Sequence, residues 1–214
     1  DGQGDGGKSM SETVRVAVDA MGGDNAPGEI VKGAVQAVQA EKDIKVFLVG
    51  RQDAVNAELA KYTYDKEKIE VVMTREKDEM LSEDSGEKTK IGDMKMRVEK
   101  INKEKPLLTV SIHQNSYPQE EIKGAQVFYY THSGEGKKAA EIMQESLLVL
   151  DDTNHRKAKA NDTYYLLKRT ERPTIIVECG FLTNTEEAGL LKQEEYQKKV
   201  AEAIVAGIKA YMEK

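Results

Sequence analysis

Two segments of the sequence place reactive side chains directly after a run of apolar residues. Residues 107–112 are followed by His113, and residues 174–177 are followed by Glu178. In a parallel α/β sheet, such residues gather at the carboxyl ends of the strands, where ligands bind. A histidine and a glutamate from neighbouring strands suit metal-assisted hydrolysis, in which a cation activates water and a carboxylate takes its proton. A hydrogen-bonded structural histidine is the alternative for His113, whereas an unpaired Glu178 is costly to bury.

A glycine-rich turn follows the first expected strand, residues 14–18, and leads into a helix expected to begin at Glu29. Backbone N–H groups at a helix N-terminus attract anions, so this turn is a candidate phosphate site. The candidate residues of this anion loop are Gly22, Gly23 and Asn25.

The other candidate groups lie in less specific surroundings. His132 and His155 fall in polar stretches and are expected at the surface. Arg156 and Lys159 provide either a grip on substrate carboxylates or a solvated basic loop. Cys179 is a candidate nucleophile, although a lone cysteine beside an apolar strand usually acts as a small buried hydrophobic residue.

Apolar periodicity indicates strands and helices in alternation, which is typical of parallel α/β units. Strands are expected at 14–18, 44–49, 69–73, 107–112, 125–130 and 174–177, and helices at 29–40, 52–61, 94–103, 136–150, 186–191 and 195–212. We expect one α/β domain over 13–214, with helices on both faces of a mostly parallel central sheet in three layers. Residues 1–12 are expected to be a leader or tag, and the acidic stretch 76–93 a long surface loop, a candidate lid.

Composition narrows the classes of protein. The 214 residues carry 32 Lys plus Arg against 38 Asp plus Glu, a net charge of −6, so we expect no nucleic-acid partner. One cysteine excludes an intramolecular disulfide, and three histidines still permit a mixed histidine–carboxylate metal site. No apolar run approaches the ~20 residues of a membrane span, and we recognise no signal peptide. The oligomeric state stays open.

Several blocks in the second part of the chain carry a resemblance to a known family. They are residues 71–76, 97–102, 111–116 (Ser-Ile-His-Gln-Asn-Ser), 124–130, 159–165 and 176–184 (Ile-Val-Glu-Cys-Gly-Phe-Leu-Thr-Asn). Through them, residues from about 70 to 214 resemble the zinc-dependent N-acetylmuramoyl-L-alanine amidases, the amidase_3 group of cell-wall hydrolases. The resemblance implies that zinc-activated water cleaves the amide between N-acetylmuramic acid and L-Ala, in peptidoglycan or muropeptides. It implies Glu178 as the catalytic residue and His113 as a zinc ligand, and Asn115, Arg156 and Lys159 are candidate substrate-binding residues.

The sequence departs from the amidase pattern at the first metal motif. Met21 stands where the Gly-His-Gly-Gly loop of the family has its histidine, and a thioether is a poor zinc ligand. Glu29 is the candidate for the ligand glutamate. Two protein ligands hold zinc poorly compared with the usual three, so weak or absent zinc and impaired hydrolysis are expected. Completion of the site is left open among Asp19, Asp24, His132 and His155.

The first part of the chain resembles a different family. Residues 13–72, with Val-Asp-Ala-Met-Gly-Gly-Asp-Asn-Ala-Pro, are similar to the opening of the phosphate acyltransferase of bacterial phospholipid synthesis. We therefore interpret the chain as a chimera, with its junction near 69–75 and one extra strand–helix unit at 44–61. The alternatives to an amidase are a folded chimera without activity and a fragment that binds phosphate or acyl phosphate. An amidase implies the cell envelope and an acyltransferase the cytoplasm, so localisation stays open.

Overall fold

The structure is a computed structural model that describes residues 13–21, 26–73 and 86–214. The expected leader, the anion loop with Gly22, Gly23 and Asn25, Asp24, and residues 76–85 of the expected loop all lie outside the described residues. Within the described part of the chain, no helix is long and apolar enough to cross a membrane.

One seven-stranded sheet forms the centre of the molecule, with strand order β3-β2-β1-β4-β7-β5-β6. The strands are β1 (Val14–Asp19), β2 (Ile44–Gly50), β3 (Ile69–Met73), β4 (Leu108–Asn115), β5 (Gln126–Tyr130), β6 (Lys159–Asn161) and β7 (Thr174–Phe181). Only the β5–β7 pair is antiparallel among these described strands. The prediction of an α/β fold with a mostly parallel sheet is confirmed.

The sheet is continuous across the two segments that resemble different families. β1 pairs with β4 in parallel from Val16 opposite Leu108 to Asp19 opposite Ser111. The strand–helix unit expected at 44–61 is β2 followed by the helix α2 (Gln52–Leu59), and β2 lies between β1 and β3. The division of the chain into a leader and one domain stays a prediction.

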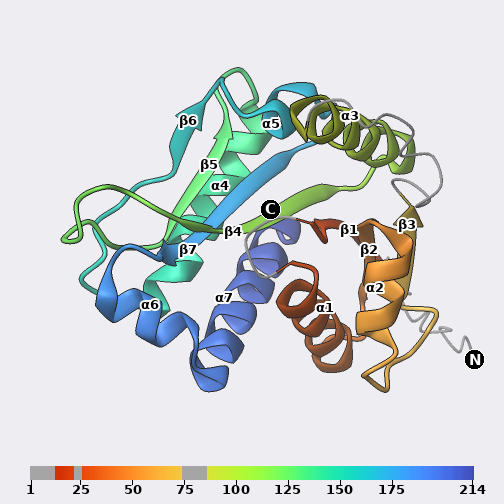
Figure 1. Ribbon diagram of the computed structural model, residues 1–214, viewed down its shortest axis with the longest axis horizontal. Helices are drawn as coiled ribbons and strands as arrows, with labels where there is room; N and C mark the ends of the chain where they lie inside the picture. Colours follow the sequence, from red (N-terminus) through yellow and green to blue (C-terminus); the bar gives the residue numbers. More distant parts are fainter. Residues whose placement is uncertain (1–12, 22–25, 74–85) are drawn as a thin grey trace, which may run out of the picture.

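Helices cover both faces of the sheet, which completes the three layers (Figure 1). They are α1 (Gly28–Ala40), α2 (Gln52–Leu59), α3 (Gly86–Glu104), α4 (Gly134–Ser146), α5 (Tyr165–Arg169), α6 (Thr185–Leu191) and α7 (Glu194–Met212). Buried residues of α1, α2, α4 and α7 pack in the larger apolar core, and those of α3 and α5 pack on the opposite face. The helical spacing of the apolar residues produces these buried stripes.

The structure corrects three boundaries that bear on the site. α3 begins at Gly86, so the prediction of a loop over 76–93 is wrong for residues 86–93. Its first turns hold a single apolar residue, Ile91, and therefore gave no periodic signal. β4 and β7 continue to Asn115 and Phe181 instead of ending at 112 and 177, because each strand pairs with the other through its polar end.

Candidate active site

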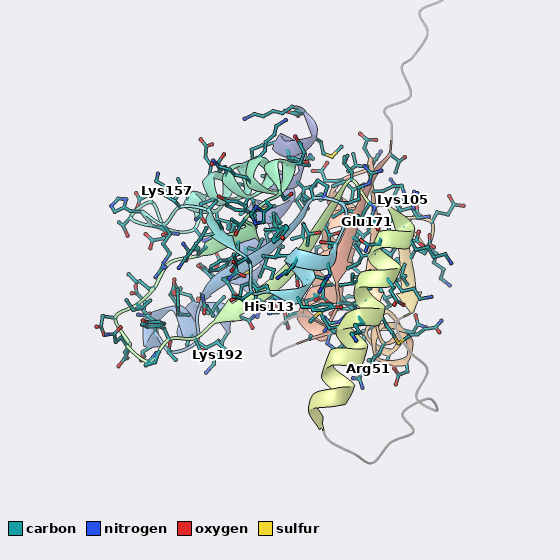
Figure 2. The ribbon with its side chains drawn as sticks, turned by 90° about the horizontal axis from the view of Figure 1, so that it is seen from above. Arg51, Lys105, His113, Lys157, Glu171 and Lys192 are labelled. Carbon is teal, nitrogen blue, oxygen red and sulfur yellow. The ribbon has the colours of Figure 1, made fainter. Side chains whose placement is uncertain are left out.

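His113 and Glu178 occupy matching positions on neighbouring strands. They are register partners in the parallel β4–β7 pair, and so they lie inside the strands and not just beyond them as expected. Side chains alternate along a strand, which places both residues on the face that α3 and α5 cover. Figure 2 shows His113 well inside the outline of the molecule, with Lys157 and Lys105 toward opposite sides.

The Glu178 carboxyl is buried in surroundings that disfavour its charge. The residue is 6% exposed, and its Oε2 has no hydrogen-bond partner among the described residues. Burial raises the pKa of Glu178 from 4.5 to about 7. A buried carboxylate without partners costs free energy, and groups with such shifts concentrate at functional sites. Glu178 is therefore suited to exchange a proton near neutral pH.

A buried hydrogen-bond chain orients His113. The Ser111 hydroxyl donates to Asp19 Oδ2 over 3.0 Å, and the same Ser111 oxygen lies 3.0 Å from His113 Nε2. Asp19 is paired with Arg97 as a carboxylate, which can only accept hydrogen bonds, so the Ser111 hydroxyl uses its proton to donate to Asp19. The Ser111 oxygen must then accept from His113, which fixes the imidazole proton on Nε2.

The carboxylate of Asp19 accepts further hydrogen bonds besides the one from Ser111. Arg97 Nη1 donates to its two oxygens over 2.7 and 2.8 Å, and the backbone N–H of Met21 donates to Oδ1 over 3.1 Å. The side chains of Arg97 and Asp19 are 9% and 2% exposed. An ion pair buried this far is strongly coupled to folding, because either partner alone would leave an unpaired charge.

The described residues do not fit a zinc site with three protein ligands. They contain no group of three or more His, Cys, Asp or Glu side chains that could hold a metal ion. Glu29 is exposed at the start of α1, whose buried residues pack on the sheet face opposite His113 and Glu178. The assignment of Glu29 and His113 as ligands stays a prediction, since Asp24 and the loop around it lie outside the described residues.

Two of the candidate substrate-binding residues make structural contacts. Arg156 donates from Nε to the Lys123 carbonyl oxygen over 2.7 Å and from Nη1 to Gln126 Oε1 over 3.1 Å. Gln126 is the register partner of Glu178 on β5, so Arg156 touches the site through that amide. Asn115 accepts the backbone N–H of Ser116 over 2.8 Å at the end of β4.

The remaining candidates divide between surface and core. Lys159, His132 and His155 are exposed, and His132 contacts the ring of Tyr130 edge-on with 5.3 Å between centroids. Cys179 is 4% exposed, and burial raises the pKa of its thiol to about 12. Its thiol therefore stays protonated at neutral pH, which agrees with a buried packing role rather than a nucleophilic one.

Sequence reasoning missed Ser111 and the part that Arg97 plays. The alternation of β4 places Ser111 on the same face as His113, which was a usable signal. Arg97 was visible as a cation beside the buried Val98 of α3, but its partner Asp19 lies 78 positions away in the sequence. No local pattern links residues so far apart.

Comparisons with known proteins agree on the fold. The amidase CwlD of Clostridioides difficile, solved in complex with the GerS lipoprotein, superposes with a TM-score of 0.70 at 27% identity, covering 94% of this chain and 98% of that one. An N-acetylmuramoyl-L-alanine amidase of Clostridium difficile 630 superposes with a TM-score of 0.68 at 23% identity, covering 95% and 98% of the two chains, and supports the fold alone.

Sequence comparisons find both resemblances. The germination-specific N-acetylmuramoyl-L-alanine amidase of Bacillus subtilis is 38% identical over 144 residues, which are 66% of this chain and 61% of that protein. The phosphate acyltransferase of Clostridium beijerinckii is 49% identical over 63 residues, which are 29% of this chain and 19% of that enzyme. The chain therefore spans less than two thirds of the amidase and about a fifth of the acyltransferase.

The family model of the N-acetylmuramoyl-L-alanine amidases matches residues 16–210, which includes the strands of the first segment as well as those of the second. The match, the superposition at 27% identity and the His113–Glu178 pair on β4 and β7 lead to one conclusion. The chain belongs to the N-acetylmuramoyl-L-alanine amidase family.

Proposed function

We propose that this chain acts on the amide between N-acetylmuramic acid and L-Ala in peptidoglycan, with greatly reduced activity, and that Glu178 is its general base. The observation that carries the proposal is the buried Glu178 carboxyl beside His113, on the sheet face where Ser111 and Asp19 orient the imidazole. Glu178 takes a proton from water as the water oxygen attacks the amide carbon. The carbon–nitrogen bond then breaks, and the proton passes to the departing L-Ala amine.

The proposed reduction in activity rests on the residues that are available as zinc ligands. In this family zinc, when bound, makes water more acidic and polarises the amide carbonyl. Here the described residues hold no three-ligand group, the Asp19 carboxylate is occupied by Arg97, and Met21 stands at the position of a histidine. Water attack without that polarisation is slower, so we infer feeble hydrolysis and weak zinc binding.

Substrate binding is proposed to involve the exposed Lys159 more than Arg156. Lys159 is the first residue of β6, and its ammonium is available to a carboxylate of the peptide stem. The Arg156 guanidinium already donates to the Lys123 carbonyl oxygen and to Gln126 Oε1. Its proposed role is therefore to position Gln126 beside Glu178 and not to bind substrate. The substrate class places the proposed action at the cell envelope.

We also propose that the chain joins two ancestries near residues 69–75. A 49% identity to a phosphate acyltransferase over 63 residues supports this. At the proposed junction, β3 pairs in parallel with β2, so the sheet is continuous there.

The proposal is tested by bound metal and by cleavage of purified muropeptides. The parent, after zinc loading and dialysis, should retain little zinc and release L-Ala-terminated peptides slowly. Glu178→Gln should abolish the residual release, whereas Glu186→Gln, an exposed change eight residues away, should not alter it. Met21→His should raise both zinc content and turnover.

Each outcome has a defined meaning once circular dichroism shows that the variants are folded. Residual release that survives Glu178→Gln would rule out Glu178 as the base. Stoichiometric zinc with rapid turnover in the parent would contradict the proposed reduction. No release by the parent or by zinc-loaded Met21→His would support the alternative, a folded chimera without activity.

A further inference from the structure

The ring of Tyr164 contacts the sheet on the face that carries Glu178. It meets Phe128 of β5 edge-on, with 5.8 Å between the ring centroids. Phe128 is the register partner of Ile176 on β7, and Ile176 lies two positions before Glu178. Residues two positions apart on a strand share a face, and so do register partners. The Tyr164 ring therefore lies against the strand next to Glu178, on the face of the proposed active site.

The Tyr164 ring is neutral and partly open to solvent. The residue is 38% exposed. Burial of the rest of the side chain, and next the nearby Glu178 carboxylate, raise the pKa of the Tyr164 hydroxyl. The phenol stays protonated at neutral pH, so the ring offers apolar surface to a substrate without repelling its carboxylates.

The turn before α5 fixes the backbone of Tyr164. Asn161 Oδ1, at the end of β6, accepts the backbone N–H of Tyr164 over 2.8 Å and that of Thr163 over 2.9 Å. Directly after Tyr165, the side chains of Leu166 and Leu167 are buried. The chain is thus held on both sides of Tyr164, which limits the positions that its ring can take.

Glu178, Phe128 and Lys159 follow one another across three neighbouring strands. β5 lies between β7 and β6 at one edge of the sheet (Figure 1). Lys159 of β6 is the register partner of Phe128, so its exposed side chain leaves the sheet on the same face. Two strand spacings, about 10 Å, separate the strand of Glu178 from that of Lys159. The Tyr164 ring contacts the residue of the middle strand.

This order matches the order of groups in the proposed substrate. The scissile amide reacts at Glu178, and a carboxylate of the peptide stem binds Lys159. L-Ala is the first residue of the stem, so it lies between the scissile amide and the stem carboxylates. A stem that runs from Glu178 to Lys159 therefore passes the Tyr164 ring with its L-Ala residue, whose side chain is a single apolar methyl group.

We propose that the Tyr164 ring binds the methyl group of this L-Ala residue and so favours a stem that begins with alanine over one that begins with glycine. The inference rests on the proposed amidase function for the identity of the substrate. It deepens that function by naming a residue that selects the first position of the stem.

The test compares two ligands of metal-free protein, an N-acetylmuramoyl dipeptide whose first residue is L-Ala and the same molecule with Gly at that position. In NMR titrations of the full chain, the L-Ala ligand should bind about fourfold more tightly, the ratio expected for burial of one methyl group. Its methyl signal should also move upfield on binding, because an aromatic ring shields protons that lie against its face. Both measurements report binding and need no turnover.

Three substitutions of Tyr164 separate the ring from its surroundings. Tyr164→Phe keeps the ring and should keep both the preference and the upfield shift. Tyr164→Ala should remove both. Tyr164→Leu, which has apolar bulk without a ring, should remove the upfield shift and serves if the alanine variant fails to fold. Tyr62→Ala is the matched control and should change neither, because Tyr62 is a partly buried tyrosine that packs against the core on the opposite face of the sheet.

The outcomes distinguish this inference from the proposed function. Preference and upfield shift that survive in Tyr164→Ala, or no saturable binding of either ligand by the parent, would overturn the inference. If cleavage still depends on Glu178 in that case, the proposed function stands without it. A preference that depends on Tyr164 in a protein that never cleaves the amide would support the inference and contradict the proposed hydrolysis.

Discussion

The Ser111 oxygen lies 3.0 Å from His113 Nε2, and it accepts a hydrogen bond there because its own proton is donated to Asp19. A neutral imidazole has one protonated nitrogen, so this contact leaves the lone pair of His113 on Nδ1. In a functional histidine, the hydrogen bond that one ring nitrogen makes commonly decides which of the two nitrogens carries the proton. Ser111 is therefore a positioning residue for His113.

Replacing Ser111 tests this directly. In Ser111→Ala, His113 loses the acceptor for its Nε2 proton, so a mixture of the two tautomers should replace the single Nε2–H form. The ¹⁵N shifts of the imidazole, read by NMR in metal-free protein, distinguish the two. The matched control is Thr109→Val, which removes a buried hydroxyl on the same face of β4 that has no described partner. An unchanged tautomer in Ser111→Ala would contradict the assignment.

The buried Arg97–Asp19 pair should contribute more to folding than an exposed pair. Arg97→Met leaves the 2%-exposed Asp19 carboxylate without its cation, which should cost about 3–5 kcal/mol in the free energy of unfolding. Adding Asp19→Asn removes the stranded charge and should recover part of that loss. Urea denaturation of the two single variants and the double variant measures both effects.

An exposed pair at the end of α2 gives the comparison for Arg97. Lys61 contacts Glu58 at 2.8 Å, but the Lys61 side chain is 61% exposed. Lys61→Met should leave the urea midpoint almost unchanged, because solvent screens that pair. Equal losses in Arg97→Met and Lys61→Met would show that burial does not govern the contribution of Arg97.

Local periodicity was sufficient for most of the fold. The apolar spacing in α1 and α7 predicted both helices to within a residue, since one face of each is buried. It failed at the first turns of α3, where the sequence holds one apolar residue over 86–93. It also failed for the three residues of β6, whose strand conformation depends on pairing with β5. These elements depend on tertiary contacts rather than on local pattern.

The candidate site was predictable only in part. His113 and Glu178 were identifiable as reactive residues after apolar runs, and the sheet then placed them in register. The link from Arg97 to Asp19 depends on how α3 crosses the sheet, which no spacing in the sequence encodes. The environment of Glu178 likewise comes from three strands meeting, because Gln126 of β5 and His113 of β4 flank it.

The buried Glu178 should make stability depend on pH. Its pKa is about 7 in the folded chain against 4.5 ordinarily, so between these values the folded state holds a proton that the unfolded state has lost. The free energy of unfolding therefore falls as pH rises through that window, by on the order of 3 kcal/mol, and the loss persists above it. Glu178→Gln removes the ionisable group and should be the more stable protein at pH 8.

Urea denaturation of metal-free parent and Glu178→Gln at pH 4.5 and pH 8 measures this dependence. The two proteins should have nearly equal free energies of unfolding at pH 4.5, where the carboxyl is protonated in the folded state and still about half protonated in the unfolded state. The variant should gain on the parent as the pH rises. A constant difference across this range would show that Glu178 titrates alike in both states.

Glu187 should stabilise the region beyond β7 by accepting two backbone hydrogen bonds. Its Oε1 accepts the Gly124 N–H over 2.9 Å and its Oε2 the Phe181 N–H over 2.7 Å, in a residue that is 8% exposed. Glu187→Gln replaces one acceptor oxygen with an NH₂ group that opposes a backbone donor. The change should cost about 2 kcal/mol, because bonds to a charged acceptor contribute more than neutral ones.

The neighbouring Glu186 supplies the control for Glu187. Glu186 is 70% exposed and contacts only the exposed Lys123 among its described ion-pair partners, at 3.2 Å. Glu186→Gln should therefore leave the urea midpoint unchanged, whereas Glu187→Gln should lower it and speed amide exchange at Gly124 and Phe181. If the Gly124 and Phe181 amides exchange as slowly in Glu187→Gln as in the parent, contacts other than the Glu187 carboxylate stabilise this region.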